Sequence, residues 1–521
     1  MKAVREQIPQ TILALLRPAA MATLVSALAA CGGGGGSSSP APSLPASPVA
    51  QQCSPNNPYV ADASAPTTPG SLNSEKLWLL SYMNAAYLWY SEIPAVNAAD
   101  PSFSADTSTG VYPSLDNYFQ ALKTPALTAS GARKDKFSFT YPTRLWNDLA
   151  SNGAVLGYGI EWVFGSMSAP NRNVRVAYVE PGSLAAQAGV QRGDKLETVN
   201  GVSADNDSSQ GGIDVLNAGI FPDASNTGPF SFVFSRNGVA QPAQTFTAAT
   251  VTKQPVLVTK VITQGGKNIG YMVFNDHIVP AETQLINAIN QFKAANVSDL
   301  VLDIRYNGGG YLYIASELAY MIAGPTRTNG KVFEQLQYNN KRAAETAQAV
   351  ETFESTACVP DANFNCTSSS ALPTLNLPRV YVLTSSSTCS ASESVINSLR
   401  GVDVDVQLIG GTTCGKPYGF TAKDNCGISY FPIEFKGVNA KGFGDYPDGF
   451  KTNCTVPDDL SRQLGDTSEG MLAAALTVQA TGSCPTGTTT TKDALLKTQG
   501  QGAQPTMLRS PVRENRLFLG R

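Results

Sequence analysis

The chain reads Thr388-Cys389-Ser390-Ala391-Ser392-Glu393 between an apolar run at 381–383 and the start of a helical pattern. The apolar run predicts a buried strand, and Ser392 and Glu393 are favoured in the first turn of a helix. Ser390 is therefore expected where a strand runs into a helix, whose N-terminus offers unpaired N–H groups to a developing oxyanion. Taken alone, the same pattern also fits a serine that only caps the helix.

A lysine follows this serine 26 positions later (416 − 390), in the pair Gly415-Lys416. The chain contains a single histidine, so lysine is the most available base for Ser390. A lysine base must be neutral, although its ordinary pKa is about 10.4, and burial among apolar groups lowers that pKa. The apolar character of 409–420 and 428–435 could supply such surroundings. The alternative is a solvated loop lysine.

Residues 410–416 also have the glycine and lysine spacing of a phosphate-binding loop. Pro417 stands where that loop needs a Ser or Thr for Mg²⁺, and proline has no backbone N–H to offer a phosphate. Residues 418–420 do not begin a convincing helix. We therefore expect no nucleotide.

A third segment runs Leu302-Asp303-Ile304-Arg305-Tyr306-Asn307-Gly308-Gly309-Gly310. It predicts a buried strand that enters a glycine loop, whose N–H groups could bind an anion or an oxyanion. Asp303 and Arg305 are expected to pair locally and hold the loop. A triple glycine by itself is more often a tight turn.

Strand and helix patterns alternate between residues 255 and 484, which favours an α/β core. Strands are expected at 270–274, 300–304, 379–383 and 404–409, and helices at 283–292, 311–322 and 391–399. Residues 71–150 have helical spacing and predict a helical N-terminal domain or cap. Residues 485–521 are a Thr/Gly-rich and then mixed tail.

Residues 155–250 change to short β-rich runs at 174–179, 195–199 and 230–234. The Pro181-Gly182 turn, the short helix at 184–188, the Gly193-Asp194 turn and the Asn200-Gly201 hairpin follow in the order of a bacterial protease PDZ domain, which this segment closely resembles. The resemblance implies that a peptide C-terminus adds as a strand beside a carboxylate-binding loop, here Tyr158-Gly159-Ile160. The alternative is a small β-domain that binds no ligand.

The N-terminus has a basic start and an apolar run at 19–30 that is too short to span a bilayer. This run ends in Leu28-Ala29-Ala30-Cys31, which resembles a bacterial lipobox. The resemblance implies cleavage before Cys31, lipidation of its thiol and anchoring in the membrane, with a lean to the outer membrane. An ordinary secretory signal is the alternative. A flexible Gly/Ser/Pro linker is expected at 32–70.

Eight further cysteines in an exported chain suggest disulfides. Spacing alone makes Cys358–Cys366 and Cys414–Cys426 plausible pairs, and the connectivity cannot be deduced. No CxxC pair exists, so a metal site is not expected. The net charge of −3, with only 15% charged residues, gives no general case for nucleic-acid binding.

Together these segments resemble peptidase family S41, the C-terminal (tail-specific) processing peptidases, over residues 75–480. That family carries an Asp-x-Arg-x-Asn-x-Gly-Gly loop, a Ser-Ala-Ser-Glu segment and a later Gly-Lys pair. The resemblance implies a multidomain α/β protein with a ClpP/crotonase-like core and a Ser/Lys dyad.

Carried over by position, the resemblance makes Ser390 the nucleophile and Lys416 the general base. The oxyanion hole would combine the N–H of Ala391 with one from the glycine loop, at Gly308 or Gly309. Many members orient the lysine with a glutamine four positions later, where this chain has Phe420. His277 has no catalytic counterpart in the family and is expected to be a surface or packing residue.

We therefore expect an exported, lipid-anchored serine endopeptidase, facing the periplasm or the cell exterior. Its PDZ domain would capture the exposed C-terminal tail of a protein substrate, and no cofactor, metal or nucleotide is required. The alternative is a PDZ-bearing lipoprotein with a degenerate core that binds peptides or acts as a scaffold. The sequence leaves open the substrate, the oligomeric state and whether the PDZ domain activates or inhibits.

Overall fold

The computed structural model describes residues 47–223, 226–360, 366–485 and 516–518. The predicted signal sequence, Cys31, the start of the predicted linker and most of the predicted tail lie outside these ranges. Among the described helices, none combines the length and hydrophobicity needed to cross a bilayer.

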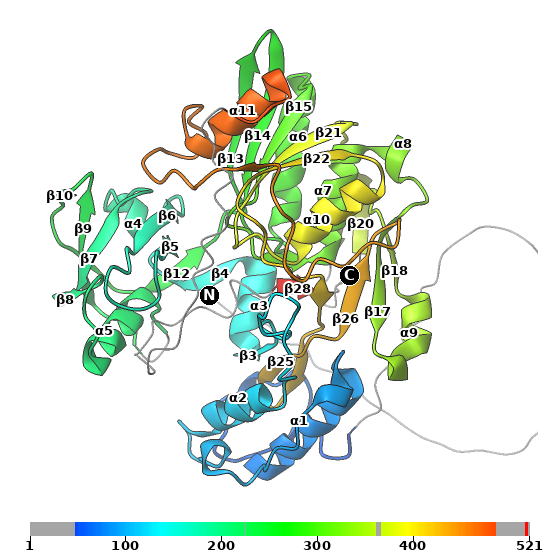
Figure 1. The fold of residues 1–521 in the computed structure, drawn as a ribbon. Helices are drawn as coiled ribbons and strands as arrows, with labels where there is room; N and C mark the ends of the chain where they lie inside the picture. Colours follow the sequence, from blue (N-terminus) through cyan, green and yellow to red (C-terminus); the bar gives the residue numbers. More distant parts are fainter. Residues whose placement is uncertain (1–46, 224–225, 361–365, 486–515, 519–521) are drawn as a thin grey trace, which may run out of the picture. The chain divides into compact units, whose positions relative to one another are not determined.

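The core is built on a six-stranded sheet in the order β13-β14-β15-β21-β22-β27 (Figure 1). β13 is antiparallel to β14, and the remaining neighbours are parallel. The strands are β13 (Val256–Gln264), β14 (Lys267–Phe274), β15 (Asp299–Asp303), β21 (Arg379–Thr384), β22 (Asp405–Gly410) and β27 (Cys454–Thr455). Their apolar runs are buried because helices cover both faces of the sheet, as in other parallel sheets.

Alternating side chains divide this sheet between two apolar cores. Met272 and Phe274 point to the larger core, which also holds apolar side chains of α6 (Ala281–Ala294), α7 (Leu312–Ala323) and α10 (Ala391–Gly401). Tyr271 and Val273 point to the other core, against α11 (Gly470–Thr481). The predicted core strands and helices all exist, and each predicted end lies within three residues of the observed one.

Smaller sheets complete the core region. One has the order β18-β17-β26-β23, and β16 pairs in parallel with β28 near the C-terminus. β19 and β20, which follow β18 in sequence, form an antiparallel pair. The bounds are β16 (Gly309–Tyr311), α8 (Pro325–Thr328), β17 (Val332–Tyr338), α9 (Ala343–Gln348), β18 (Val350–Thr352), β19 (Thr356–Pro360), β20 (Cys366–Ala371), β23 (Tyr418–Gly419), β26 (Phe435–Val438) and β28 (Arg516–Phe518).

The N-terminal region is helical, as its spacing predicts, and contributes three described helices. They are α1 (Leu72–Ala86), α2 (Val111–Ala121) and α3 (Thr143–Asn152). The strand β3 (Phe139–Pro142) joins β25 (Ile428–Phe431) and β24 (Lys423–Asn425) of the core in one sheet. This region therefore shares its apolar core with the α/β part.

The structure differs from the sequence-based expectation at the end of the predicted linker. Residues 47–70 are folded: β1 (Gln52–Cys53) pairs with β2 (Thr68–Pro69), and Cys53 forms a disulfide with Cys426. The Pro/Ser-rich composition predicts flexibility, but a covalent bond to a residue far along the chain holds this segment in place.

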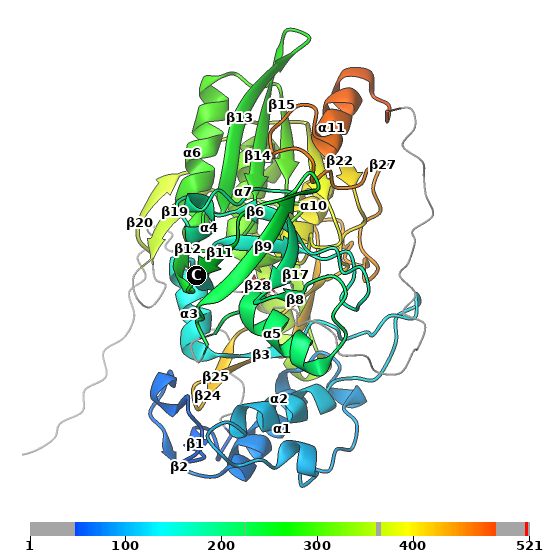
Figure 2. The same cartoon turned by 90° about the vertical axis from the view of Figure 1, so that its left-hand side faces the viewer.

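A β-rich unit with its own apolar core occupies residues 154–252, with the sheet order β10-β9-β7-β6-β5 (Figure 1). The turned view shows β9, β8 and α5 of this unit (Figure 2). Its core is rich in aromatic side chains such as Trp162, Phe232 and Phe234. Its elements are β4 (Ala154–Gly157), β5 (Ile160–Val163), β6 (Arg175–Val179), α4 (Leu184–Gln187), β7 (Lys195–Val199), β8 (Val202–Ser203), α5 (Gln210–Ile220), β9 (Phe230–Arg236), β10 (Val239–Ala240), β11 (Gln244–Phe246) and β12 (Ala249–Thr252). With this unit, the predicted multidomain α/β class is confirmed.

The disulfides correct one expected pair. Cys414 bonds to Cys389 and Cys426 bonds to Cys53, so the Cys414–Cys426 pair suggested by spacing is wrong. A third bond joins Cys454 to Cys484. Cys358 is also disulfide-bonded; its pairing with Cys366 stays a prediction, because the side chain of Cys366 lies outside the described part.

Candidate active site

The three segments singled out in the sequence follow the carboxyl ends of three adjacent parallel strands. The glycine loop follows β15, Ser390 follows β21, and Lys416 follows β22. In open α/β sheets, ligands bind at this edge of the sheet. Segments more than 80 residues apart in sequence are therefore brought to one place.

Ser390 occupies a strained position at the start of α10. Its φ of 61° and ψ of −119° are rare for a residue with a side chain, and such strain concentrates at functional sites. The side chain is fully buried, and its Oγ has no hydrogen-bond partner among the described residues. Ser390 and Glu393 nevertheless have the arrangement of a capping box, in which the N–H of Ser390 donates to the Glu393 carboxylate. The alternative in which Ser390 caps the helix therefore stays open beside the catalytic one.

Glu393 connects the serine segment to the lysine segment. Its Oε2 accepts hydrogen bonds from the backbone N–H of Ser390, at 3.0 Å, and of Lys416, at 2.8 Å. Its Oε1 accepts from the N–H of Gly415 and the hydroxyl of Thr413. Burial raises the pKa of Glu393 above its usual value, and these four donors oppose that shift. One buried carboxyl group therefore fixes two loops together.

The same contacts bear on the phosphate-loop alternative. The N–H groups of Gly415 and Lys416, which a phosphate-binding loop would aim at its ligand, both donate to Glu393. A carboxylate of the chain therefore occupies these donors, in agreement with the expectation that no nucleotide binds here.

Two more links reinforce the connection between the loops. The disulfide between Cys389 and Cys414 joins the residue before Ser390 to the residue two positions before Lys416. The carbonyl of Asn307 accepts from the N–H of Cys389 and from the hydroxyl of Ser392. Ser392 therefore has a structural contact, as expected, and the serine turn is fastened to the glycine loop.

Lys416 is also buried, with 1% of its surface exposed, and its Nζ has no hydrogen-bond partner among the described residues. The amine lies 4.2 Å from the centre of the Phe420 ring and 5.4 Å from that of Phe137. Burial lowers its pKa well below the usual lysine value, and the charges of Asp135 and Glu393 oppose this only in part. A solvated loop lysine is therefore not what the structure shows. Ser390 Oγ and Lys416 Nζ do not hydrogen-bond to each other.

The glycine loop supplies fewer free donors than its sequence suggests. The N–H of Gly309 donates to Asn307 Oδ1 at 2.9 Å, so it is not available to an oxyanion in this structure. This leaves Gly308, with Ala391 at the first turn of α10, as the candidate pair of donors. The assignments of Ser390, Lys416, Ala391 and Gly308 to catalytic roles stay predictions.

His277 contacts this loop and is fully buried, so of the two expected positions, surface or packing, the packing position is the one observed. Its Nδ1 lies 3.0 Å from Asn307 Oδ1, and its backbone exchanges hydrogen bonds with Gly309 and Tyr311. A Cβ at Gly310 would stand 2.1 Å from the His277 carbonyl oxygen, so only glycine allows this approach. The pair of His277 and Asn307 is a feature that the sequence pattern did not reveal.

Arg305 forms the expected pair with Asp303, at 2.8 Å, and a larger network besides. It also contacts Glu469, at the start of α11, and Asp458. The guanidinium is buried, and each side of its planar fork meets a carboxylate. This network holds the loop that follows β15.

The predicted peptide-binding loop lies at the end of the β-rich unit's sheet. Tyr158 is buried, Gly159 has a positive φ of 83°, and Ile160 begins β5. β5 is the last strand in the sheet order, so within the described chain its outer edge is open to an added strand. The role of these three residues in peptide binding stays a prediction.

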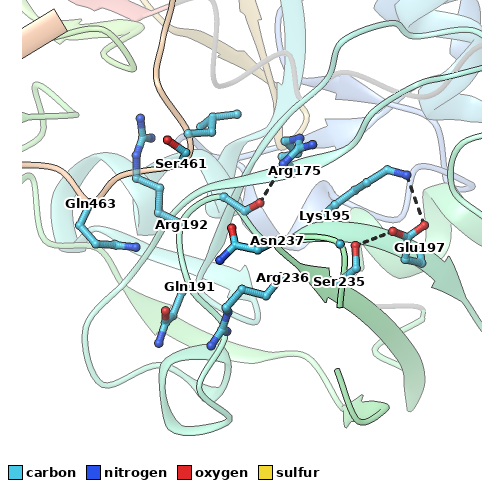
Figure 3. Close-up of a pocket in the computed structure, with 13 residues that line it drawn as sticks. Arg175, Gln191, Arg192, Lys195, Glu197, Ser235, Arg236, Asn237, Ser461 and Gln463 are labelled. Carbon is cyan, nitrogen blue, oxygen red and sulfur yellow. Dashed lines mark hydrogen bonds and ion pairs between the residues drawn. The ribbon is translucent and has the colours of Figure 1, made fainter. Parts of the chain in front are cut away.

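One described cavity is lined by residues other than those of the candidate dyad. It has a volume of about 500 Å³ and is lined by Arg175, Lys195 and Arg236 of the β-rich unit and by residues 460, 461 and 463 (Figure 3). Lys195 pairs with two carboxylates and Arg236 with Asp194, so these charges are already compensated.

One cluster among the described residues has the composition of a metal site: Cys389, Glu393 and Cys414. The two sulfurs are joined in a disulfide, and the carboxylate is occupied by the four donors named above. These atoms therefore serve the link between the loops and are not arranged to take a metal ion.

Three family models match the chain. Peptidase family S41 matches residues 268–423, the Peptidase S41 N-terminal domain matches 74–139, and a PDZ domain model matches 175–211. The S41 match contains the glycine loop, Ser390 and Lys416, and the PDZ match falls in the β-rich unit.

A carboxyl-terminal-processing protease from Picosynechococcus sp. is 25% identical over 241 residues. The match covers 45% of this chain and about half, 49%, of that relative. A crystal structure described as an S41 protease from Bacteroides fragilis superposes with a TM-score of 0.54 at 23% identity, over 78% of this chain and 97% of that one. The photosystem II D1 C-terminal processing protease gives a TM-score of 0.44 at 18% identity, over 78% and 100% of the two chains.

Proposed function

Because this chain belongs to peptidase family S41 and carries a PDZ domain, we propose that it is a serine endopeptidase that uses a Ser390/Lys416 dyad. One observation carries the proposal. The backbones of Ser390 and Lys416 are fixed to the same oxygen of Glu393, while their functional atoms are buried and uncommitted. Each buried polar atom without a hydrogen bond destabilises the fold by about 1–3 kcal/mol, and a purely structural role would not explain why the chain keeps two of them here.

In the proposed mechanism, Ser390 Oγ attacks the carbonyl carbon of a peptide bond, and neutral Lys416 takes its proton. The N–H groups of Ala391 and Gly308 stabilise the oxyanion. Lys416 then gives the proton to the leaving amine, and water hydrolyses the acyl-enzyme. A lysine with a lowered pKa suits this cycle, since a lower pKa increases the fraction of neutral amine at a given pH.

We further propose that the substrates are exported proteins whose exposed C-terminal tails bind the PDZ domain beside residues 158–160. The support is the open edge of β5 and the backbone of that loop. We also propose that the protein is exported and anchored through lipidated Cys31, on the side of the envelope that faces the periplasm or the exterior. This rests on the lipobox-like sequence before Cys31.

The test uses residues 32–521 and an unfolded substrate with an apolar C-terminal tail. Cleavage should fall at least about 1,000-fold in both Ser390→Ala and Lys416→Ala. Ser386→Ala and Lys423→Ala are the controls, since both side chains are exposed near the site. Equal cleavage by the wild type and Ser390→Ala would sink the mechanism.

A degenerate, peptide-binding protein remains the second candidate. The observation in its favour is that Ser390 Oγ and Lys416 Nζ do not hydrogen-bond to each other. Saturable binding of the tailed substrate, with no cleavage across a wide range of pH, would select this candidate over the peptidase.

A further inference from the structure

Lys416 lacks a polar group to orient its amine, although it is held in a defined place. Among the described residues, no side-chain oxygen or nitrogen hydrogen-bonds to its Nζ. Instead, the amine faces the ring of Phe420, whose centre lies 4.2 Å away, and the more distant ring of Phe137. The Phe137 ring also lies 5.0 Å from the amine of Lys136, so it is shared between two lysines.

The Phe420 ring is itself held rigidly. Phe420 is fully buried and meets Phe139 and Phe431 with ring centres 5.7 Å and 5.4 Å apart. Both contacts are edge-to-face, a favourable geometry for aromatic pairs. The ring that faces Lys416 therefore cannot swing away without disturbing these two aromatic side chains, and its face is fixed toward the amine.

An aromatic face interacts differently with the two forms of a lysine. The ring excludes water and so favours the neutral amine, but its negative quadrupole attracts an ammonium that forms beside it. A base in this mechanism needs both properties, because it begins neutral and becomes charged when the serine proton arrives.

The charged groups around Lys416 do not replace the ring. Asp135 acts on the lysine by its charge, yet its carboxylate is bound by the hydroxyl of Tyr87 and by the N–H groups of Phe137 and Ser138. Glu393 acts in the same way and is occupied by the four donors described above. Lys136 donates to the carbonyl of Cys414.

We propose that Phe420 is the positioning residue for Lys416: its ring face holds the amine toward Ser390 and stabilises the ammonium that forms during acylation. This inference rests on the proposed function of the dyad. The proton moves from Ser390 Oγ to Lys416 Nζ and then to the leaving amine, and the ring takes part in no covalent step.

The decisive experiment weakens the face of the ring while keeping its shape. Phe420 is replaced by 4-fluoro, 3,5-difluoro and pentafluoro phenylalanine in the full chain, purified in detergent. Successive fluorination should lower kcat stepwise, to about one tenth for the most fluorinated ring, with little change in KM. The acid limb of the kcat/KM profile should move to lower pH, because the ammonium loses a stabilising contact.

Phe431 provides the matched control. It is equally buried and belongs to the same aromatic group, but it makes no described contact with the lysine amine. The same fluorinated residues at 431 should leave kcat and the acid limb unchanged. Phe420→Leu, which keeps the site apolar and removes the ring face, should behave like the pentafluoro variant. Equal responses at 420 and 431 would overturn the proposal.

A second measurement separates this inference from the proposed function. In Ser390→Ala protein, the titration of Lys416 is followed by NMR of labelled lysine Cε, which needs no catalysis. Its midpoint should fall as Phe420 is fluorinated and should not respond at Phe431. An unchanged midpoint refutes the role of Phe420 even if the enzyme is active. A lack of Ser390-dependent cleavage with a shifted midpoint refutes the peptidase and keeps the ring–amine contact.

Discussion

At the scale of single residues, Glu393 links the loops of the site. The motif predicts its position but not its contacts. Glu393 is the last residue of the Ser-Ala-Ser-Glu segment, and the sequence predicts only a first-turn acid there. In the structure its carboxylate receives four hydrogen bonds, three of them from the segment around Lys416. Such contacts across 20 or more positions depend on how the strands neighbour each other, which local patterns do not contain.

We predict that Glu393→Gln lowers kcat by about 100-fold or more, because an amide nitrogen would face N–H groups that need an acceptor. The same change should destabilise the fold by about 1–3 kcal/mol. Steady-state kinetics and thermal unfolding would measure both. Asp445→Asn, at a carboxylate that is 83% exposed, is the control and should change neither.

The buried Lys416 should lower the free energy of unfolding of the protein. Its folded pKa lies below its unfolded pKa, so the unfolded chain binds this proton more tightly and folding is penalised where the unfolded lysine is charged. The penalty is absent above the unfolded pKa, near 10.4, and grows as the pH falls toward the folded pKa. Lys416→Met should therefore abolish cleavage yet stabilise the protein by about 0.5–2 kcal/mol near pH 7.

Scanning calorimetry from pH 7 to 10 would measure this effect. The gain from Lys416→Met should shrink as the pH rises, whereas Lys423→Met, at an exposed lysine, should show no such trend. A gain that stays constant over this range would contradict the assignment of a lowered lysine pKa.

At the scale of elements, the sequence predicts the strands and helices of the core well. Short runs rich in Val, Leu and Ile, such as 300–304 and 379–383, form β15 and β21 as expected. The three chemical segments follow from the same pattern, because the carboxyl ends of neighbouring parallel strands share one edge. The disulfides do not follow, because Cys389 and Cys414 approach only after β21 and β22 have paired.

The disulfide between Cys389 and Cys414 leads to a prediction about these two loops. The double variant Cys389→Ser/Cys414→Ser should lose about 3 kcal/mol of stability, as the bond closes a loop of moderate length. It should also lower kcat, because the turns that carry Ser390 and Lys416 gain freedom. Cleavage assays at a temperature where the variant is folded would measure this.

The bond between Cys454 and Cys484 is the control for this effect, since it joins β27 to the segment after α11. Its double serine variant should lose comparable stability while keeping kcat near the wild-type value. Equal losses of kcat in both variants would show that the disulfides act through general stability alone.

At the scale of the whole molecule, the contacts between the PDZ-like unit and the core include a buried arginine. Arg192 donates to Asp458 at 2.6 Å and to Tyr306, the residue directly before Asn307. Tyr306 also packs against Tyr178 of the PDZ-like unit. The sequence predicts both units separately. The contact between them could not be predicted, because motifs and hydrophobic periodicity carry no information on how two units pack.

We predict that Arg192→Ala loosens this contact by about 1–3 kcal/mol, since it removes a donor to the Tyr306 hydroxyl and one of the two arginines that contact Asp458. Trypsin should then cut faster after Lys253, which lies between β12 and β13 and is 9% exposed in the intact protein. A lower kcat should accompany the change, because Tyr306 leads into the glycine loop. Arg144→Ala, at a side chain that is 57% exposed, should alter neither rate.

The disulfide between Cys53 and Cys426, which are 373 positions apart in sequence, closes the chain between them into a covalent ring. A single cut anywhere inside that ring, including the cut after Lys253, leaves one molecule with all its mass. Such a nicked chain migrates as one band without reductant and as two with it. Any search for self-cleavage in this protein must therefore compare the two conditions, because without reductant the disulfide holds the two fragments together.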